Sequence, residues 1–235
     1  MSKKSKTKPY LIGAGVAVVA TLAGLASYTA TRPGPPAVVE QQAEQQVAAY
    51  PELEKYARRD AADPLALGRA DAPVVMIEYA DFACGYCGKF ARDIEPALIE
   101  KYVDAGVLRI EWRNFPIFGE ESERVARASW AAGQQGRFWP FHRAAYADGA
   151  KERGFAKDRL LALAREAGVP DLDRFGRDVD SAAARAAVAA DQEQGWSLGA
   201  TSTPSFLVNG RPIAGAQPME TFASAIESAR REAAK

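Results

Sequence analysis

The chain has 235 residues, of which 48% are hydrophobic, so it is long enough for one compact domain with a sizeable core and additional segments. Its 30 basic residues balance its 30 acidic residues, and the formal net charge is zero. Because no basic block follows the first eight residues, nothing in the charge pattern indicates nucleic-acid binding.

The N-terminus combines a basic segment, residues 1–9, with an uncharged and largely apolar segment, residues 10–31. A helix through the second segment would be at least about 28 Å long, enough to cross the hydrocarbon core of a membrane, and the lysines before it favour a cytoplasmic N-terminus. We therefore expect a single-pass signal anchor in the cell membrane, with the remaining chain extracytoplasmic. The alternative is a signal peptide cut after Ala26, which would give a secreted protein.

Residues 32–64 predict a linker, because they are rich in proline, glutamine and other polar residues. A short helix is expected within this linker, around residues 51–59. The folded domain is expected over residues 65–235.

The domain opens with three elements in the order strand, helix, strand. An apolar run predicts a buried strand at residues 73–80, and alternation predicts a second strand at residues 108–115. Between them, residues 88–104 carry apolar side chains at helical spacing, with a kink expected at Pro96.

Five helix-patterned stretches follow and predict an inserted helical subdomain over about residues 120–198. The stretches are residues 120–135, 137–147, 157–167, 171–178 and 181–198. After them, Asn209-Gly210 between two short apolar runs is a strong hairpin signal, and residues 219–233 predict a closing helix. This order of elements predicts an α/β chain with a thioredoxin-like fold and an inserted helical subdomain.

The two cysteines of the chain are three positions apart, in the run Cys84-Gly85-Tyr86-Cys87 between the first strand and the helix. The positive end of a helix dipole stabilises a thiolate, so Cys84 is expected to be the nucleophile of a redox dithiol. Cys87, one helical turn further on, is close enough to attack a mixed disulfide on Cys84 and release the substrate.

Two cysteines can also serve other kinds of site. A structural zinc or iron–sulfur site needs about four soft ligands, and the chain has two cysteines and one histidine, His142, so no metal site is expected. A purely structural disulfide would contribute only about 2 kcal/mol for a loop this short. Two thiolates could also hold Cu(I), as in a copper chaperone.

Glu78 lies in the otherwise apolar first strand, six positions before Cys84. A buried carboxyl group there would have a raised pKa and could relay protons to the inner cysteine. The alternative is a solvated residue at the margin of the sheet.

Thr203 and Pro204 stand at the head of the apolar run that begins the hairpin. A cis bond before Pro204 would expose the preceding backbone as an edge with which an extended peptide substrate can pair. A trans proline that starts an ordinary strand is the alternative.

Taken together, these residues resemble the family of bacterial exported DsbA-like thiol:disulfide oxidoreductases, over about residues 65–229. The motifs that carry the resemblance are Asp81-Phe82-Ala83-Cys84-Gly85-Tyr86-Cys87, Arg113-Asn114-Phe115-Pro116, Gln135-Gly136-Arg137-Phe138-Trp139-Pro140-Phe141-His142, and Gly199-Ala200-Thr201-Ser202-Thr203-Pro204-Ser205-Phe206-Leu207-Val208-Asn209-Gly210. The resemblance implies an exposed nucleophile at Cys84, a resolving thiol at Cys87, a buried acid at Glu78 and a cis-proline at Pro204 that faces the disulfide.

The chain departs from the family between its cysteines. Strongly oxidising members carry Pro-His there, whereas this chain has Gly85-Tyr86, the dipeptide expected to tune the redox potential. The Gly-Tyr pair, with Thr203 before Pro204, is similar to the DsbC-type periplasmic disulfide isomerases. Those proteins have a separate dimerisation domain, which residues 32–64 are too few to supply.

We therefore expect an enzyme, a membrane-anchored protein thiol-disulfide oxidoreductase that exchanges disulfides with exported proteins, with disulfide donation favoured. No nucleotide or flavin motif is present, so no cofactor is expected, and a membrane redox partner must reset the dithiol. The alternatives are a disulfide isomerase or reductase of the same fold, and a non-catalytic copper-binding or peptide-holding thiol module.

Overall fold

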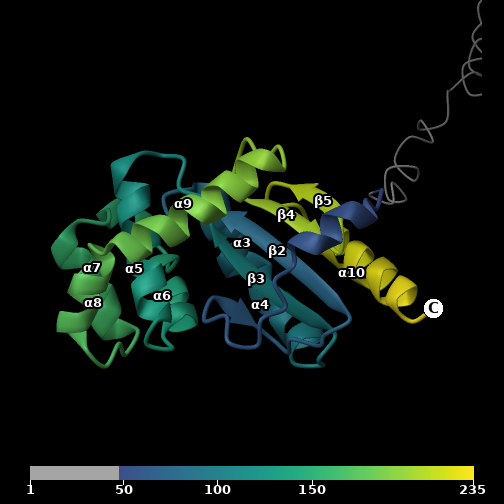
Figure 1. Cartoon of the computed structure of the whole chain (residues 1–235), viewed down its shortest axis with the longest axis horizontal. Coiled ribbons are helices and arrows are strands. Elements are labelled where there is room, and N and C mark those ends of the chain that lie inside the picture. The colour runs from purple at the N-terminus through teal and green to yellow at the C-terminus, as the bar shows by residue number, and fades with distance from the viewer. Residues whose placement is uncertain (1–47) are drawn as a thin grey trace, which may run out of the picture. The chain divides into compact units, whose positions relative to one another are not determined.

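The computed structural model describes residues 48–235 (Figure 1). The predicted basic segment, the predicted membrane anchor and most of the predicted linker lie outside these residues. Among the helices of residues 48–235, none is both long enough and apolar enough to span a membrane.

The described domain is built on a five-stranded sheet with the strand order β1-β3-β2-β4-β5. The strands are β1 (Ala66–Leu67), β2 (Val74–Ala80), β3 (Leu108–Asn114), β4 (Ser205–Val208) and β5 (Arg211–Ala214). The two central strands β2 and β3 run parallel, while β4 is antiparallel to both β2 and β5. The predicted strands and the Asn209-Gly210 hairpin are confirmed.

Helices fill two of the connections between the strands. A first group joins β2 to β3: α3 (Gly85–Asp93), α4 (Glu95–Leu98) and the π-helix η2 (Ile99–Val103). A second group joins β3 to β4: α5 (Glu120–Gly133), α6 (Phe138–Ala145), η3 (Lys151–Arg153), α7 (Lys157–Glu166), α8 (Leu172–Val179) and α9 (Ala182–Ser197). The chain closes with α10 (Met219–Ala233), and α5 to α8 gather at one side of the sheet in Figure 1. The predicted fold class with its helical insertion is confirmed.

The helix predicted over residues 88–104 is divided rather than kinked. Its regular hydrogen bonding ends at Ile94, where φ is −121° and ψ is −50°. Pro96 explains the break, because its ring clashes with the carbonyl group four residues earlier and it has no N–H to donate. The break lets the chain turn inward, and Glu95 at the start of α4 becomes buried.

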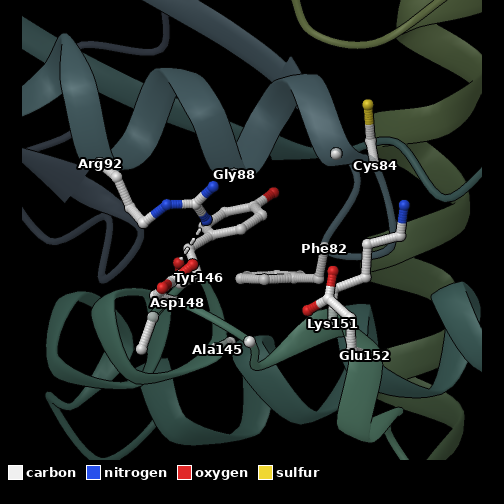
Figure 2. A pocket seen from close by; sticks show the side chains of 12 residues that line it. Phe82, Cys84, Gly88, Arg92, Ala145, Tyr146, Asp148, Lys151 and Glu152 are labelled. Carbon is white, nitrogen blue, oxygen red and sulfur yellow. Dashed lines mark hydrogen bonds between the residues drawn. The ribbon is translucent and has the colours of Figure 1, made fainter.

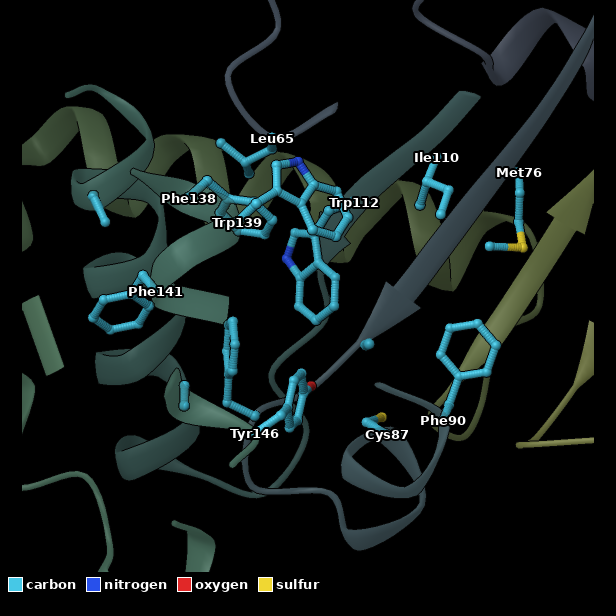
Figure 3. Close-up of a cluster of buried hydrophobic side chains, with 14 of the residues drawn as sticks. Leu65, Met76, Cys87, Phe90, Ile110, Trp112, Phe138, Trp139, Phe141 and Tyr146 are labelled. Carbon is cyan, nitrogen blue, oxygen red and sulfur yellow. The ribbon is translucent and has the colours of Figure 1, made fainter. Parts of the chain in front are cut away.

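Both faces of the central strand β2 are covered. Val74, Met76 and Ala80 point into a large apolar cluster that also includes side chains of α3, α6 and α10. Figure 3 shows part of this cluster, with Cys87 and Phe90 of α3 reaching into it. The alternate residues of β2 join a smaller cluster on the opposite face.

The smaller cluster changes the predicted limits of the domain. Leu53 and Tyr56 of the short 3-10 helix η1 (Pro51–Tyr56) pack into it, and the Tyr50 amide donates to the Gly210 carbonyl at 3.1 Å. The end of the predicted linker, residues 48–64, therefore belongs to the folded unit. The sequence pattern missed this contact because it joins residues far apart in the chain.

Candidate active site

Cys84 follows a short loop from the end of β2 and caps the N-terminus of α3. Figure 2 shows its sulfur at the start of this helix. The side chain is 5% exposed, and its thiol donates to the Thr203 carbonyl oxygen at 3.3 Å. Cys87 is fully buried one turn further on, and both cysteines are free thiols. The resemblance implied an exposed nucleophile, but most of Cys84 is covered.

The two thiols differ strongly in acidity. Hydrogen bonds that the ionised sulfur can accept, first from Cys87 and then from Thr203 and the amides of Cys87 and Tyr86, lower the pKa of Cys84 to about 6 against the opposing effect of burial. Burial raises the pKa of Cys87 well above its ordinary value. At neutral pH the outer sulfur is therefore largely a thiolate nucleophile, while the inner one keeps its proton.

The Thr203–Pro204 bond is cis, as the sequence led us to expect. Both residues are buried, and the Pro204 carbonyl accepts from the Gly215 amide at 2.8 Å. The Thr203 hydroxyl has no hydrogen-bond partner among the described residues. It is therefore free to donate to the neighbouring sulfur when Cys84 ionises.

Gly85 and Tyr86 lie on the outside of the site. Tyr86 is 70% exposed, which makes it one of the few large apolar side chains of the described domain that face solvent. On one side of Cys84 a surface cavity is lined by Phe82, Tyr146 and Lys151, among others (Figure 2). The described residues hold no group of three or more histidine, cysteine, aspartate or glutamate side chains that could bind a metal ion.

Glu78 is completely buried on β2 and points to the same face of the sheet as Met76 and Ala80. Neither of its carboxyl oxygens has a hydrogen-bond partner among the described residues. Burial, together with the charge of Glu95, raises the pKa of Glu78 well above its ordinary value. The sequence left a solvated position open, and the structure places the residue in the core instead.

Three further residues of this region were not singled out from the sequence as functional. Glu95 is 3% exposed, and one of its carboxyl oxygens lies 3.7 Å from Nδ1 of the fully buried His142. Asp81 accepts hydrogen bonds from the amides of Ala83 and Ile117, at 2.8 and 2.7 Å, and so holds the loop before Cys84. Apart from the break that Pro96 predicts near Glu95, the sequence carries no signal for these contacts.

The chain is similar in sequence to several known proteins. A family model described as thioredoxin matches residues 60–228. A probable disulfide bond formation protein D of Bacillus cereus is 33% identical over 150 residues, which cover 61% of this chain and 69% of that protein. The Na(+)/H(+) antiporter NhaA 3 of Salinispora tropica is 34% identical over 164 residues, and that match covers 69% of this chain but only 24% of the antiporter.

Solved structures agree with the sequence comparison. A thioredoxin-like oxidoreductase from Silicibacter pomeroyi superimposes with a TM-score of 0.63 and 30% identity, over 78% of this chain and 99% of that one. The alpha-DsbA1 protein of Wolbachia pipientis superimposes with a TM-score of 0.63 and 25% identity, over 72% and 92% of the two chains. The chain thus belongs to the thioredoxin family, and within it to the DsbA-like thiol:disulfide oxidoreductases.

Proposed function

We propose that this enzyme exchanges disulfides with exported proteins through Cys84 and Cys87, acting as a disulfide donor that residues 10–31 anchor in the cell membrane. The observation that carries the proposal is the difference in acidity between the two thiols, with the pKa of Cys84 lowered to about 6 and that of Cys87 raised. The similarity to disulfide bond formation protein D supports the same activity.

The exchange proceeds through two displacements. A substrate thiolate attacks the Cys84 sulfur of the Cys84–Cys87 disulfide, the disulfide breaks, and Cys87 leaves as a thiolate that takes up a proton. A second substrate thiolate then attacks the mixed disulfide and releases Cys84. The substrate loses two electrons, the dithiol gains them, and a membrane redox partner must remove them again.

The low pKa of Cys84 favours donation over reduction. A thiolate that is stable at neutral pH is a good leaving group, and its stability favours the reduced form of the enzyme, which makes the disulfide form more oxidising. Isomerase or reductase activity of the same fold is the second candidate, supported by the Gly85-Tyr86 dipeptide. The equilibrium of the dithiol against a series of glutathione redox buffers separates them, because a donor must equilibrate at a more oxidising potential.

Substrate binding is assigned to the backbone around Thr203 and Pro204. The support is the 3.3 Å contact between the Cys84 sulfur and the Thr203 carbonyl, which puts this backbone beside the sulfur that exchanges with the substrate. A Thr203→Val variant, measured in the same glutathione series, should shift the equilibrium because it removes a hydroxyl able to donate to the thiolate.

The central test uses the two single cysteine variants. Cys87→Ser should accumulate mixed disulfides on Cys84 when it is mixed with a disulfide-containing protein, whereas Cys84→Ser should accumulate none. Equal trapping by both variants, or by neither, contradicts the exchange. Stoichiometric Cu(I) binding by a protein that turns over no dithiol substrate would support the copper-binding alternative.

The location has its own test. In cell fractions the full chain should stay with membranes after an alkaline wash, and added protease should reach the Cys84 domain only from the extracytoplasmic side. A soluble product that begins after Ala26 would instead identify a cleaved signal peptide.

A further inference from the structure

The core behind Cys87 contains ionisable side chains that the exchange described above does not use. Glu95 of α4 and His142 of α6 are 3% and 0% exposed, and Glu78 of β2 is 0% exposed. One carboxyl oxygen of Glu95 and both ring nitrogens of His142 lack a hydrogen-bond partner among the described residues. Buried groups in this condition cost free energy, so their presence calls for a role.

A series of neighbouring residues links these groups across four elements, β2, β3, α6 and α4. Glu78 is opposite Trp112 in the register of β2 and β3. The Trp112 ring lies 5.0 Å from the His142 ring, and His142 Nδ1 lies 3.7 Å from a carboxyl oxygen of Glu95. Glu78 and Glu95 therefore enter the same region of the core from opposite sides.

We propose that Glu95 is a positioning residue that acts through its charge on Glu78 and thereby sets the pH at which Cys87 resolves the mixed disulfide. The proposal rests on the proposed exchange through Cys84 and Cys87. In the resolving step the Cys87 proton passes to the Glu78 carboxylate, and the Cys87 thiolate attacks the Cys84 sulfur. The Cys84–Cys87 disulfide forms, the mixed disulfide breaks, and the substrate leaves as a thiolate that takes up a proton.

Two buried carboxyl groups in one region of the core do not ionise independently. Burial raises the pKa of Glu95 to about 8, and burial and Glu95 together hold the pKa of Glu78 well above its ordinary value. As the pH rises, Glu95 ionises first, and its negative charge then keeps the proton on Glu78. Because protonated Glu78 cannot accept the Cys87 proton, Glu95 slows resolution from about pH 8 upward, where it is ionised, and prolongs the mixed disulfide there.

The other ionisable groups around this pair do not replace Glu95 in that role. They are Asp81, Cys84 and Cys87 near the helix start, and His142, Arg143 and Tyr146 from the α6 side. Burial lowers the pKa of His142 to about 3 and raises that of Tyr146, so both remain neutral at physiological pH. Arg143 is exposed, and its charge favours ionised Glu95.

Resolution can be measured directly with a chromogenic aromatic disulfide added to the reduced protein. The first coloured thiolate released reports attack by Cys84, and the second reports attack by Cys87 on the mixed disulfide. Glu95→Gln should shift the rising limb of the second rate to lower pH by about one unit, which makes this step faster above about pH 8, by up to about tenfold, and leaves it nearly unchanged at neutral pH. The first rate should stay unchanged.

Two control variants define the role of the charge. Glu100→Gln makes the same charge change at an exposed position five residues further along. It should leave the pH dependence of the second rate the same as in the wild-type protein. Glu95→Asp keeps the carboxyl group, so the rising limb of its second rate should lie at a higher pH than that of Glu95→Gln. A Glu95→Gln profile that coincides with wild type, or moves to higher pH, overturns the proposal.

The thiolate-release experiment distinguishes failure of the proposed disulfide exchange from failure of the proposed role of Glu95. If the wild-type protein releases no second thiolate, the exchange itself is refuted. If release has two phases but Glu95→Gln has no effect on the second, only the role of Glu95 is refuted. Should Glu95→Gln not fold, carbon-13 titration of glutamate carboxyls in the wild-type protein decides instead: two coupled carboxyls far above the ordinary range support the pair, and ordinary independent titrations overturn it.

Discussion

Cys84 and Cys87 are neighbours on one helix turn, yet their surroundings give them opposite chemistry. Cys84 caps α3 and receives hydrogen bonds on its sulfur, while Cys87 points into the apolar cluster beside Phe90 (Figure 3). The distinction that the CxxC spacing only suggested is thus produced by burial and hydrogen bonding.

This difference predicts selective labelling of the reduced protein. Near pH 6, iodoacetamide should modify Cys84 well before Cys87, because about half of Cys84 and almost none of Cys87 is ionised there. Peptide mapping by mass spectrometry after short exposure measures the ratio. Equal labelling of the two thiols, following the pH profile of a free thiol, would contradict the assigned roles.

Glu78→Gln should slow the second phase of coloured thiolate release and also stabilise the protein at neutral pH. The raised pKa of Glu78 means that the folded state keeps its full stability below the unfolded-state pKa and loses stability as pH rises toward the folded-state pKa. Relative to wild type, Glu78→Gln should therefore be nearly neutral at acid pH and more stable by about 1–3 kcal/mol at neutral pH.

Urea unfolding at both pH values measures this difference, and Glu100→Gln is again the control because Glu100 is exposed. A stability gain that is the same at acid and neutral pH would mean that ionisation of Glu78 is not its cause. If the second phase of thiolate release is unchanged in Glu78→Gln, Glu78 does not accept the Cys87 proton.

At the scale of elements, the docking of η1 on the β4–β5 hairpin depends on one glycine. Gly210 has φ of +73°, and a Cβ at this position would collide with the Tyr50 carbonyl group. The same hairpin residue accepts a hydrogen bond from the Tyr50 amide. The turn therefore needs glycine both for its conformation and for the close approach of the segment before η1.

Gly210→Ala should cost about 2–4 kcal/mol of unfolding free energy and expose residues 48–59 to limited proteolysis. Gly136→Ala is the matched control, since Gly136 has φ of +68° and nothing within 4 Å of a Cβ. It should cost only about 1–2 kcal/mol, the penalty of the left-handed conformation alone. Equal losses in the two variants would mean that the contact with Tyr50 contributes nothing.

At the scale of the whole molecule, a buried network of charged residues connects the segment after η1 and helix α9 to strand β3 of the sheet. Glu111 of β3 accepts from the amides of Arg58 and Arg59 at 2.9 and 2.8 Å, and from the guanidinium groups of Arg109 and Arg113 at 3.0 and 2.8 Å. The network continues through an ion pair between Arg58 and Asp191 of α9. The charged residues of β3 are therefore buried, although their alternation with apolar residues is typical of a half-exposed strand.

Glu111→Gln should destabilise the protein by about 3–5 kcal/mol, because it leaves buried arginine charge without its partner. Thermal unfolding should show a clearly lower midpoint. Glu120→Gln, which removes one partner of the exposed pair with Arg124, should change stability by less than about 1 kcal/mol. Similar midpoints for the two variants would show that the Glu111 network does not hold the domain together.

The sequence by itself determined the order of strands and helices, the hairpin at Asn209-Gly210 and the place of Cys84 at a helix start. These features depend on periodicity, turn chemistry and short motifs, which act between residues close in the chain. Only the tertiary structure decided that Glu78 and Glu95 share one region of the core and that residues 48–59 belong to the domain. Burial depends on which distant elements pack against a side chain. The sequence around Glu78 and Glu95 is therefore compatible both with solvated residues at the margin of the sheet and with a pair of buried carboxyl groups.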